Sequence, residues 1–301
     1  MSKSAFLFPG QGAQYVGMGR DFYEQSGEFR HAIDAADRFC GNGLKEAMFN
    51  GPEDKLQQTD YAQPAIFAMS YGALQVLNKK HPGLKPDFVA GLSLGEYSAL
   101  AASGALSFED TLRLLQKRAA FMQEAAQLKK GAMAAVIGIE VAVIKNICGV
   151  CRAEVANFNA PDQTVITGEA SAVNAACLKL TEAGAKRVIP LSVSGAFHSS
   201  LMKPAADKFV TALEQAPLKN AAVPIVGNVD ARPCVTAQEV REELARQIVS
   251  SVQWVKTIEF LVSRGVDRFI EIGPGKILKG LVRRINKDLD VENLEKMSDL
   301  K

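Results

Sequence analysis

The fold of this chain is decided by the stretch Phe88-Val89-Ala90-Gly91-Leu92-Ser93-Leu94-Gly95-Glu96-Tyr97-Ser98-Ala99-Leu100. An apolar run enters a Gly-x-Ser-x-Gly turn and leaves into an alanine-rich segment, which predicts a strand, a tight turn and a helix. That order is typical of a nucleophile elbow, and it argues against a chance match to a short motif. Gly91 and Gly95 lack the Cβ atoms that would clash where strand and helix approach, so Ser93 can occupy a strained backbone position. The turn would expose the Ser93 hydroxyl and direct the next amides, beginning with Leu94, at a bound group.

Strand-like and helix-like segments alternate on both sides of this turn. We expect strands at 5–8, 87–90, 223–228 and 268–272, and helices around 18–39, 64–79 and 107–128. Strands separated by helices predict a parallel sheet that is covered on both faces. The last ten or so residues are polar, and we expect them to fray.

Between residues 132 and 193 the pattern changes. The predicted elements are strands at 132–139, 154–158, 164–167 and 187–193, and helices at 140–148 and 170–183. Their order, β-α-β-β-α-β, is that of a ferredoxin-like unit. We therefore expect an α/β-hydrolase-like parallel-sheet core formed by residues 1–127 and 194–301, with a ferredoxin-like subdomain inserted as residues 128–193.

The bulk properties narrow the class of protein. The 301 residues are 48% apolar and 23% charged, which excludes a disordered chain, and the net charge is only +2. Nothing in this balance favours nucleic acid or a membrane as the primary partner. The apolar run at 5–8 is too short for a signal peptide, and the five scattered cysteines suit a reducing compartment. We expect a soluble cytoplasmic protein.

A serine nucleophile needs a neighbouring base, and the chain has three histidines. His31 and His81 are most simply surface residues. His198 follows a predicted strand among small residues and comes after Ser93 in the chain, so it is the best candidate for the base. The acceptor that orients its other ring nitrogen could be a carboxylate or a backbone carbonyl, and the sequence leaves both open.

Arg118 lies in an unusual position on the predicted helix 107–128. Arg113, Lys117 and Glu124 share the solvated face of that helix, whereas Arg118 falls inside its apolar arc. Its guanidinium either extends outward to water or meets an anion from the protein or from a substrate.

Together these motifs resemble the malonyl-CoA:acyl carrier protein transacylases of dissociated fatty-acid synthesis, from about residue 4 to residue 285. The motifs that carry the resemblance are Phe8-Pro9-Gly10-Gln11-Gly12, Gln63-Pro64-Ala65, Gly91-Leu92-Ser93-Leu94-Gly95-Glu96, Arg118, Gly195-Ala196-Phe197-His198-Ser199 and Gly273-Pro274-Gly275-Lys276. One departure is Leu92, where many close relatives carry histidine, so any polar role at that position is absent here.

The resemblance implies a role for each catalytic residue. Ser93 would be the acylated nucleophile and His198 the base that later returns the proton. The backbone amides of Gln11 and Leu94 would bind the oxyanion, and the main-chain carbonyl of Gln247 would orient the histidine in place of a triad acid.

The resemblance also implies substrate contacts. Arg118 would anchor the free carboxylate of the malonyl group, and Gln63, in the motif at 63–65, is a further candidate for substrate binding. Asn159 stands at the end of a predicted strand, where it either lines the cleft or has a plain turn role. Lys186 and Arg187 match a basic pair that would meet CoA phosphates or the acidic carrier protein. The alternative for these two residues is that they are ordinary charges at the end of a strand.

The expected function is therefore transfer of a malonyl group from malonyl-CoA to the phosphopantetheine thiol of acyl carrier protein, through a malonyl-serine. We expect a monomer with no metal and no cofactor beyond its substrates. The alternatives are a serine esterase or thioesterase, an acyltransferase of polyketide assembly with another acyl preference, and a non-catalytic scaffold that kept the fold.

Overall fold

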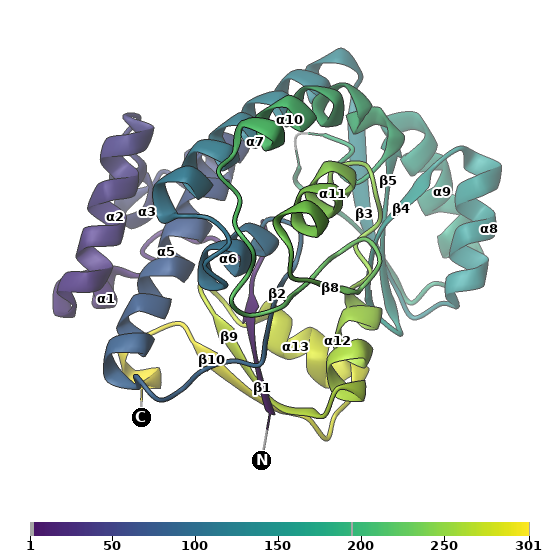
Figure 1. Ribbon diagram of the computed structural model, residues 1–301. Helices are drawn as coiled ribbons and strands as arrows, with labels where there is room; N and C mark the ends of the chain where they lie inside the picture. The colour runs from purple at the N-terminus through teal and green to yellow at the C-terminus, as the bar shows by residue number, and fades with distance from the viewer. Residues whose placement is uncertain (1–2, 194, 301) are drawn as a thin grey trace.

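Two β-sheets organise the computed structural model, which describes residues 3–193 and 195–300 (Figure 1). The first sheet has six strands in the order β10-β9-β1-β2-β7-β8, and the second has four in the order β4-β5-β3-β6. The protein is thus a mixed α/β fold with one largely parallel sheet and one antiparallel sheet. Of the predicted domain limits, residues 1, 194 and 301 lie outside the described residues, whereas 127, 128 and 193 lie within them.

The first sheet is built around β1. Its strands are β1 (Lys3–Phe8), β2 (Phe88–Gly91), β7 (Ile225–Val226), β8 (Pro233–Cys234), β9 (Val266–Ile272) and β10 (Asp290–Leu294). Strand β1 pairs in parallel with β2 and β9, and β8 alone pairs antiparallel, with β7. Residues 5–8 are fully buried, as expected for a central parallel strand that is covered on both faces. The predicted strands at 5–8, 87–90 and 268–272 are confirmed, and the one at 223–228 forms only at 225–226.

Helices cover both faces of this sheet. On one face Phe6 and Phe8 pack into the larger core, and on the other Ala5 and Leu7 pack into a second core. The larger core takes residues from α1 (Arg20–Gln25), α2 (Gly27–Cys40), α3 (Leu44–Asn50), α4 (Glu53–Gln57), α5 (Thr59–Lys80), α6 (Gly95–Ala102), α7 (Phe108–Leu128), α10 (Lys203–Gln215) and α11 (Ala237–Gln247). The second core takes residues from α12 (Trp254–Ser263) and α13 (Ile277–Ile285).

The connection from β2 to α6 is the predicted elbow. Ser93 has φ of 53°, in the left-handed region where a side chain is strained. A Cβ on Gly91 would lie 2.0 Å from the carbonyl carbon of Gly95, and one on Gly95 would lie 2.0 Å from the carbonyl oxygen of Phe8. Neither position can therefore carry a side chain, and strand, turn and helix approach as closely as the sequence predicts.

The second sheet is formed by residues between α7 and His198. Its elements are β3 (Gly131–Ile137), α8 (Val141–Cys151), β4 (Glu154–Ala160), β5 (Gln163–Glu169), α9 (Ala170–Glu182) and β6 (Arg187–Pro190). All strand pairs in it are antiparallel. Helices α8 and α9 cover its outer face, where Ala134 and Val136 are buried (Figure 1). Met133 and Ala135 alternate to the inner face and join the larger core.

The segment that leads into α12 is hydrogen-bonded to the edge of the second sheet. Val252, in the segment that leads into α12, accepts a hydrogen bond from the Phe158 amide at 2.9 Å and donates one to the Ala156 carbonyl at 2.8 Å. These bonds continue the edge of β4 onto the segment that follows α11, and they fix the second sheet beside the first.

The C-terminal residues differ from the prediction. Residues 290–294 form strand β10 and 297–299 a 3₁₀ turn, whereas the sequence analysis expected this part of the chain to fray. Val291 and Leu294 are buried, and the Met297 amide donates a hydrogen bond to the Asp21 carboxylate at 2.7 Å. These contacts and the parallel pairing of β10 with β9 dock the segment at the edge of the sheet.

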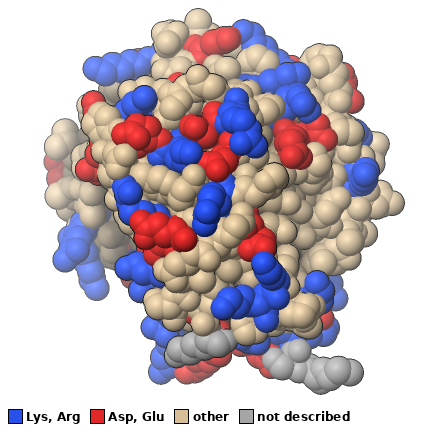
Figure 2. All heavy atoms as spheres, turned by 90° about the vertical axis from the view of Figure 1, so that its left-hand side faces the viewer, with Lys and Arg blue, Asp and Glu red and all other residues tan. Residues whose placement is uncertain are grey.

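Positive and negative side chains are mixed on the face of the molecule that Figure 2 shows. On the face that lies to the left in Figure 1, Lys and Arg side chains alternate with Asp and Glu side chains (Figure 2). Ion pairs such as Lys45–Asp34, at 2.7 Å, contribute to this mixture. Among residues 3–193 and 195–300, no helix is both long and apolar enough to cross a membrane.

Candidate active site

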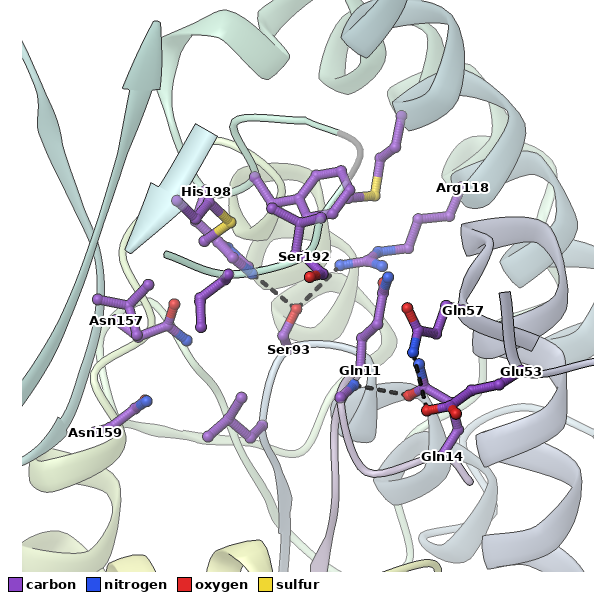
Figure 3. Close-up of a pocket in the computed structure, with 18 residues that line it drawn as sticks. Gln11, Gln14, Glu53, Gln57, Ser93, Arg118, Asn157, Asn159, Ser192 and His198 are labelled. Carbon is purple, nitrogen blue, oxygen red and sulfur yellow. Dashed lines mark hydrogen bonds between the residues drawn. The ribbon is translucent and has the colours of Figure 1, made fainter. Parts of the chain in front are cut away.

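A cavity of about 420 Å³ opens where the carboxyl ends of β1 and β2 face the second sheet (Figure 3). The second sheet, the loop after β1, the turn after β2, α4, α7 and the segment after β6 contribute to its wall. The lining residues are Gln11, Gly12, Gln14, Glu53, Gln57, Leu92, Ser93, Arg118, Met122, Met133, Asn157, Asn159, Val165, Leu191, Ser192, Val193, Phe197 and His198.

Ser93 and His198, 105 residues apart in the chain, meet in this cavity. The Ser93 Oγ lies 2.7 Å from the His198 Nε2 (Figure 3). The elbow presents the Ser93 hydroxyl. His198 precedes a short 3₁₀ turn (Ser200–Met202), and its own backbone has a φ of 58°. Two strained residues therefore face one another at hydrogen-bond distance, as a nucleophile and its base require.

Two backbone carbonyls orient the His198 ring. Its Nδ1 lies 3.0 Å from the Gln247 oxygen and 3.0 Å from the Ser250 oxygen. Carbonyls can only accept, so Nδ1 carries the proton and Nε2 accepts from the Ser93 hydroxyl. The choice that the sequence left open is thus settled in favour of backbone carbonyls.

The environment keeps the imidazole neutral. Burial, and then the nearby Arg118 cation, lower the pKa of His198 from 6.5 to about 4. A neutral ring at physiological pH is the form that can take a proton from Ser93.

Asn228 holds the backbone of the elbow. Its Oδ1 accepts from the Ser93 amide at 2.6 Å, and its Nδ2 donates to the Gly91 carbonyl at 2.7 Å. This buried side chain therefore bridges the two sides of the strained turn. Asn228 is not among the residues predicted from the sequence. The available signal was an amide residue at the end of the predicted strand 223–228, which neighbours the strand before the elbow.

The amides of Gln11 and Leu94 border the nucleophile. Leu94 directly precedes the first turn of α6, and Gln11 lies in the loop after β1. The loop and the elbow touch, because a Cβ on Gly10 would lie 2.3 Å from the Leu92 oxygen. Within the described part of the chain neither amide donates a hydrogen bond to the protein. Both remain available for a developing oxyanion.

Arg118 is buried and only 1% exposed, so its side chain does not extend outward to water. One terminal nitrogen donates to the Gln247 Oε1 at 3.2 Å and lies 3.4 Å from the Ser93 Oγ. Its Nε has no acceptor, and the guanidinium carbon lies 5.2 Å from the Tyr97 ring centroid. No carboxylate of residues 3–193 and 195–300 lies within ion-pair distance of it. A buried cation without a counter-ion, facing a cavity, is suited to an anionic ligand.

The other predicted binding residues lie at different depths. Asn159 lines the cavity and has a buried Oδ1 without a partner. Gln63 does not line it: its side chain is buried behind Met122, with 3.9 Å between its Nε2 and the Met122 sulfur. Lys186 and Arg187 are exposed at the start of β6, outside the cavity, although the chain continues from there into the cavity wall.

The site contains no candidate metal centre. No group of three or more His, Cys, Asp or Glu side chains in the described ranges is placed to hold a metal ion. The chemistry that the cavity offers comes from a serine–histidine pair, two free amides and one unpaired guanidinium.

Known proteins are similar to this chain in sequence and in structure. A family model described as acyl transferase domain matches residues 5–298. The malonyl CoA-acyl carrier protein transacylase of Bacillus subtilis is 45% identical over 96% of this chain and 92% of its own length. The protein of the same name from Staphylococcus aureus is 39% identical over 100% of this chain and 98% of its own length.

Solved structures agree with these relatives. The malonyl CoA-acyl carrier protein transacylase of Coxiella burnetii superposes with a TM-score of 0.96 at 35% identity, over 99% of this chain and 96% of that chain. A malonyl-transacylase in complex with its type II PKS acyl-carrier protein superposes with a TM-score of 0.96 at 38% identity, over 99% of this chain and 98% of that chain.

Proposed function

The chain belongs to the malonyl CoA-acyl carrier protein transacylases of the acyl transferase family, and from this premise we propose that it moves a malonyl group from CoA to acyl carrier protein through an ester on Ser93. The observation that carries the proposal is the 2.7 Å contact between Ser93 and His198 beside an unpaired, buried Arg118. The first pair supplies the nucleophile and base of an acyltransferase, and the arginine supplies selection for an acyl group with a free carboxylate.

The first half-reaction forms the acyl-enzyme. As the Ser93 Oγ bonds to the thioester carbonyl carbon of malonyl-CoA, its proton passes to the His198 Nε2. The negative charge on the carbonyl oxygen is held by the amides of Gln11 and Leu94, each of which lowers the barrier by about 3–4 kcal/mol. The C–S bond then breaks, and the imidazolium returns its proton to the departing CoA sulfur.

The second half-reaction reverses these roles. The phosphopantetheine thiol of the carrier protein gives its proton to His198, and its sulfur attacks the malonyl ester. The same two amides hold the second oxyanion, and Ser93 leaves as an alcohol after it regains the proton. The carbonyls of Gln247 and Ser250 accept from Nδ1 throughout, so they stabilise the imidazolium without a buried carboxylate.

Recognition of the acyl group rests on Arg118. A malonyl carboxylate can accept two parallel hydrogen bonds from the guanidinium and neutralise its buried charge. Asn159 offers an unpaired oxygen on the opposite wall, and Gln63 backs Met122. Lys186 and Arg187, on the strand that leads into the cavity wall, would meet CoA phosphates or acidic groups of the carrier protein.

The architecture fits this division of work. In our proposal the six-stranded sheet and its helices are an α/β-hydrolase-like core, residues 1–127 and 194–301. The β-α-β-β-α-β segment, residues 128–193, is a ferredoxin-like subdomain that closes the cavity. The strand order β4-β5-β3-β6 and its antiparallel pairing support this description. The reaction requires no cofactor beyond the two pantetheine-bearing substrates.

The rate of Ser93 acylation is expected to stay flat as the pH is lowered from 8 and to fall only below about 4, the pKa of His198. Protonation removes the base, so the rate falls about tenfold per pH unit below that value. Rapid-quench kinetics of adduct formation at limiting malonyl-CoA would measure it. A fall in rate that already begins near pH 6.5, the ordinary pKa of histidine, would contradict a buried neutral ring.

Circular dichroism must accompany this profile, because the same group affects folding. The folded pKa lies below the ordinary value, so the unfolded chain binds more protons between about pH 6.5 and 4. Stability contributed by neutral His198 is complete above this window and falls as the pH decreases through it.

Intact-mass spectrometry tests the function directly. The protein mixed with malonyl-CoA should gain one malonyl group, keep it in buffer, and lose it when phosphopantetheinylated carrier protein is added. A serine esterase or thioesterase would instead release malonate to water rapidly. Parallel reactions with methylmalonyl-CoA and acetyl-CoA define the acyl range, and failure to form any adduct would rule out the proposal.

A further inference from the structure

Glu96 lies behind the cavity rather than in its wall. It is the second residue of α6, is 1% exposed, and does not line the cavity. We propose, on the basis of the function proposed above, that Glu96 is a positioning residue: it fixes the side-chain amide of Gln247, which in turn holds Arg118 in place for the malonyl carboxylate.

The amide of Gln247 has partners on both sides. Its Nε2 donates to the Glu96 Oε2 at 2.6 Å and to the Ser93 carbonyl at 3.0 Å. Its Oε1 accepts from the Arg118 guanidinium at 3.2 Å. In this orientation each donor meets an acceptor. The flipped amide would set its NH₂ against the guanidinium and its oxygen against the Ser93 carbonyl oxygen. The partners therefore select one orientation.

Glu96 contributes the shorter of the two bonds that select this orientation. The Ser93 carbonyl belongs to the strained elbow and is present in any variant that folds. Without the Glu96 acceptor, a buried N–H of Gln247 would lose its partner, which favours rotation of the amide. The oxygen would then turn away from Arg118, whose Nε already lacks an acceptor.

The contact needs an acceptor and not a charge. Burial and the neighbouring Glu243 raise the pKa of Glu96 well above its usual range, which favours the neutral carboxyl. A neutral carboxyl still presents one acceptor oxygen to Gln247. Glutamine at position 96 has the same shape and also presents one oxygen, so it can replace the contact, whereas methionine fills the space without accepting.

The effect should appear in acyl selectivity. Arg118 contacts the free carboxylate of a malonyl group, which an acetyl group lacks. A misplaced guanidinium therefore weakens malonyl transfer more than acetyl transfer. The ratio of the two kcat/KM values is independent of the fraction of folded enzyme, so a purely structural role of Glu96 would not change it.

The experiment compares Glu96→Met with Glu96→Gln by acylation of Ser93 from malonyl-CoA and from acetyl-CoA. We expect Glu96→Met to lower the malonyl-to-acetyl ratio about tenfold, mainly through a higher KM for malonyl-CoA, and Glu96→Gln to keep it within about twofold. Glu96→Ala serves as the disrupted variant if methionine is not tolerated. An unchanged ratio in the disrupted variant, or an equal fall in Glu96→Gln, overturns the proposal.

Two further variants separate this role from general damage. Glu271 is another buried carboxyl, and it accepts from the amides of Leu278 and Lys279 at 2.9 and 2.8 Å, away from the cavity. Glu271→Met should lower stability without changing the ratio. Gln247→Met should lower the ratio as Glu96→Met does, and the double variant should be no worse than either. Additive losses would show that Glu96 does not act through Gln247.

The wild-type protein distinguishes failure of this inference from failure of the function. If it forms no malonyl adduct, the proposed function fails before Glu96 is tested. If it forms the adduct and prefers malonyl-CoA, but the ratio is unaffected by Glu96→Met, only the positioning role is refuted.

Discussion

Alanine at position 93 is expected to leave no malonyl group on the protein and to lower transfer to the carrier protein by about 10⁴–10⁶-fold. In the proposed mechanism this hydroxyl carries the acyl group, so no neighbouring residue can replace it. The fold should survive, because among residues 3–193 and 195–300 the Oγ is hydrogen-bonded only to His198 and the Arg118 guanidinium, whereas the elbow is held through backbone groups. Intact mass and single-turnover transfer measure the loss, and an undiminished adduct would place the ester elsewhere.

Removal of the base should not add to this loss. Alanine at position 198 alone is expected to lower acylation by about 10²–10⁴-fold, since the hydroxyl then loses its proton acceptor. In the Ser93→Ala background the same change should have almost no further effect, because the two side chains act as one unit. If the fold-losses of the two single variants multiply in the double variant, His198 acts independently of Ser93.

The second large effect is expected for Arg118→Ala. Malonyl transfer should fall on the order of 10²-fold or more, since a desolvated, charge-assisted pair with the carboxylate is lost. Acetyl transfer should be kept or raised, because no buried guanidinium is then left unpaired. The measurement is kcat/KM for both thioesters, and the signature is a reversal of the preference rather than a loss of activity.

Arg113→Ala is the matched control for this experiment. Arg113 lies on the same helix, five residues earlier, but it is exposed and pairs with Asp110. Its removal should leave both acyl transfers unchanged. Equal losses for malonyl and acetyl groups in Arg118→Ala would contradict a role in selectivity and point to damage of the site.

The parts of this site that the sequence could predict are those with a local signature. The elbow depends on thirteen consecutive residues, because glycine at 91 and 95 is required by contacts within and beside that segment. Arg118 was noticeable because a cation inside an apolar arc conflicts with helical periodicity. The helix 107–128 itself is confirmed, with Ser107 as its N-terminal cap.

The residues that the sequence could not predict act through distant backbone groups. The second acceptor of the His198 ring is the carbonyl of Ser250, and any residue type presents a carbonyl. Asn228 bonds to a turn 135 residues earlier, which depends on the parallel pairing of β7 with β2. Only the register of the sheet brings such groups together. The predicted strand at 187–193 is too long: β6 ends at Pro190, where its pairing with β3 ends, and this limit also depends on the register of a sheet.

The hydrogen bonds between Val252 and the edge of the second sheet have a mechanical consequence. Val252 is two residues from the Ser250 carbonyl that holds the imidazole, and its own backbone is bonded to the strand that carries Asn157 and Asn159. The His198 ring and the strand that carries Asn157 and Asn159 are therefore both hydrogen-bonded to residues 250–252. We therefore expect a displacement of the second sheet to move the segment around Val252 with it, which would limit changes in the distance between the His198 ring and Asn157 and Asn159.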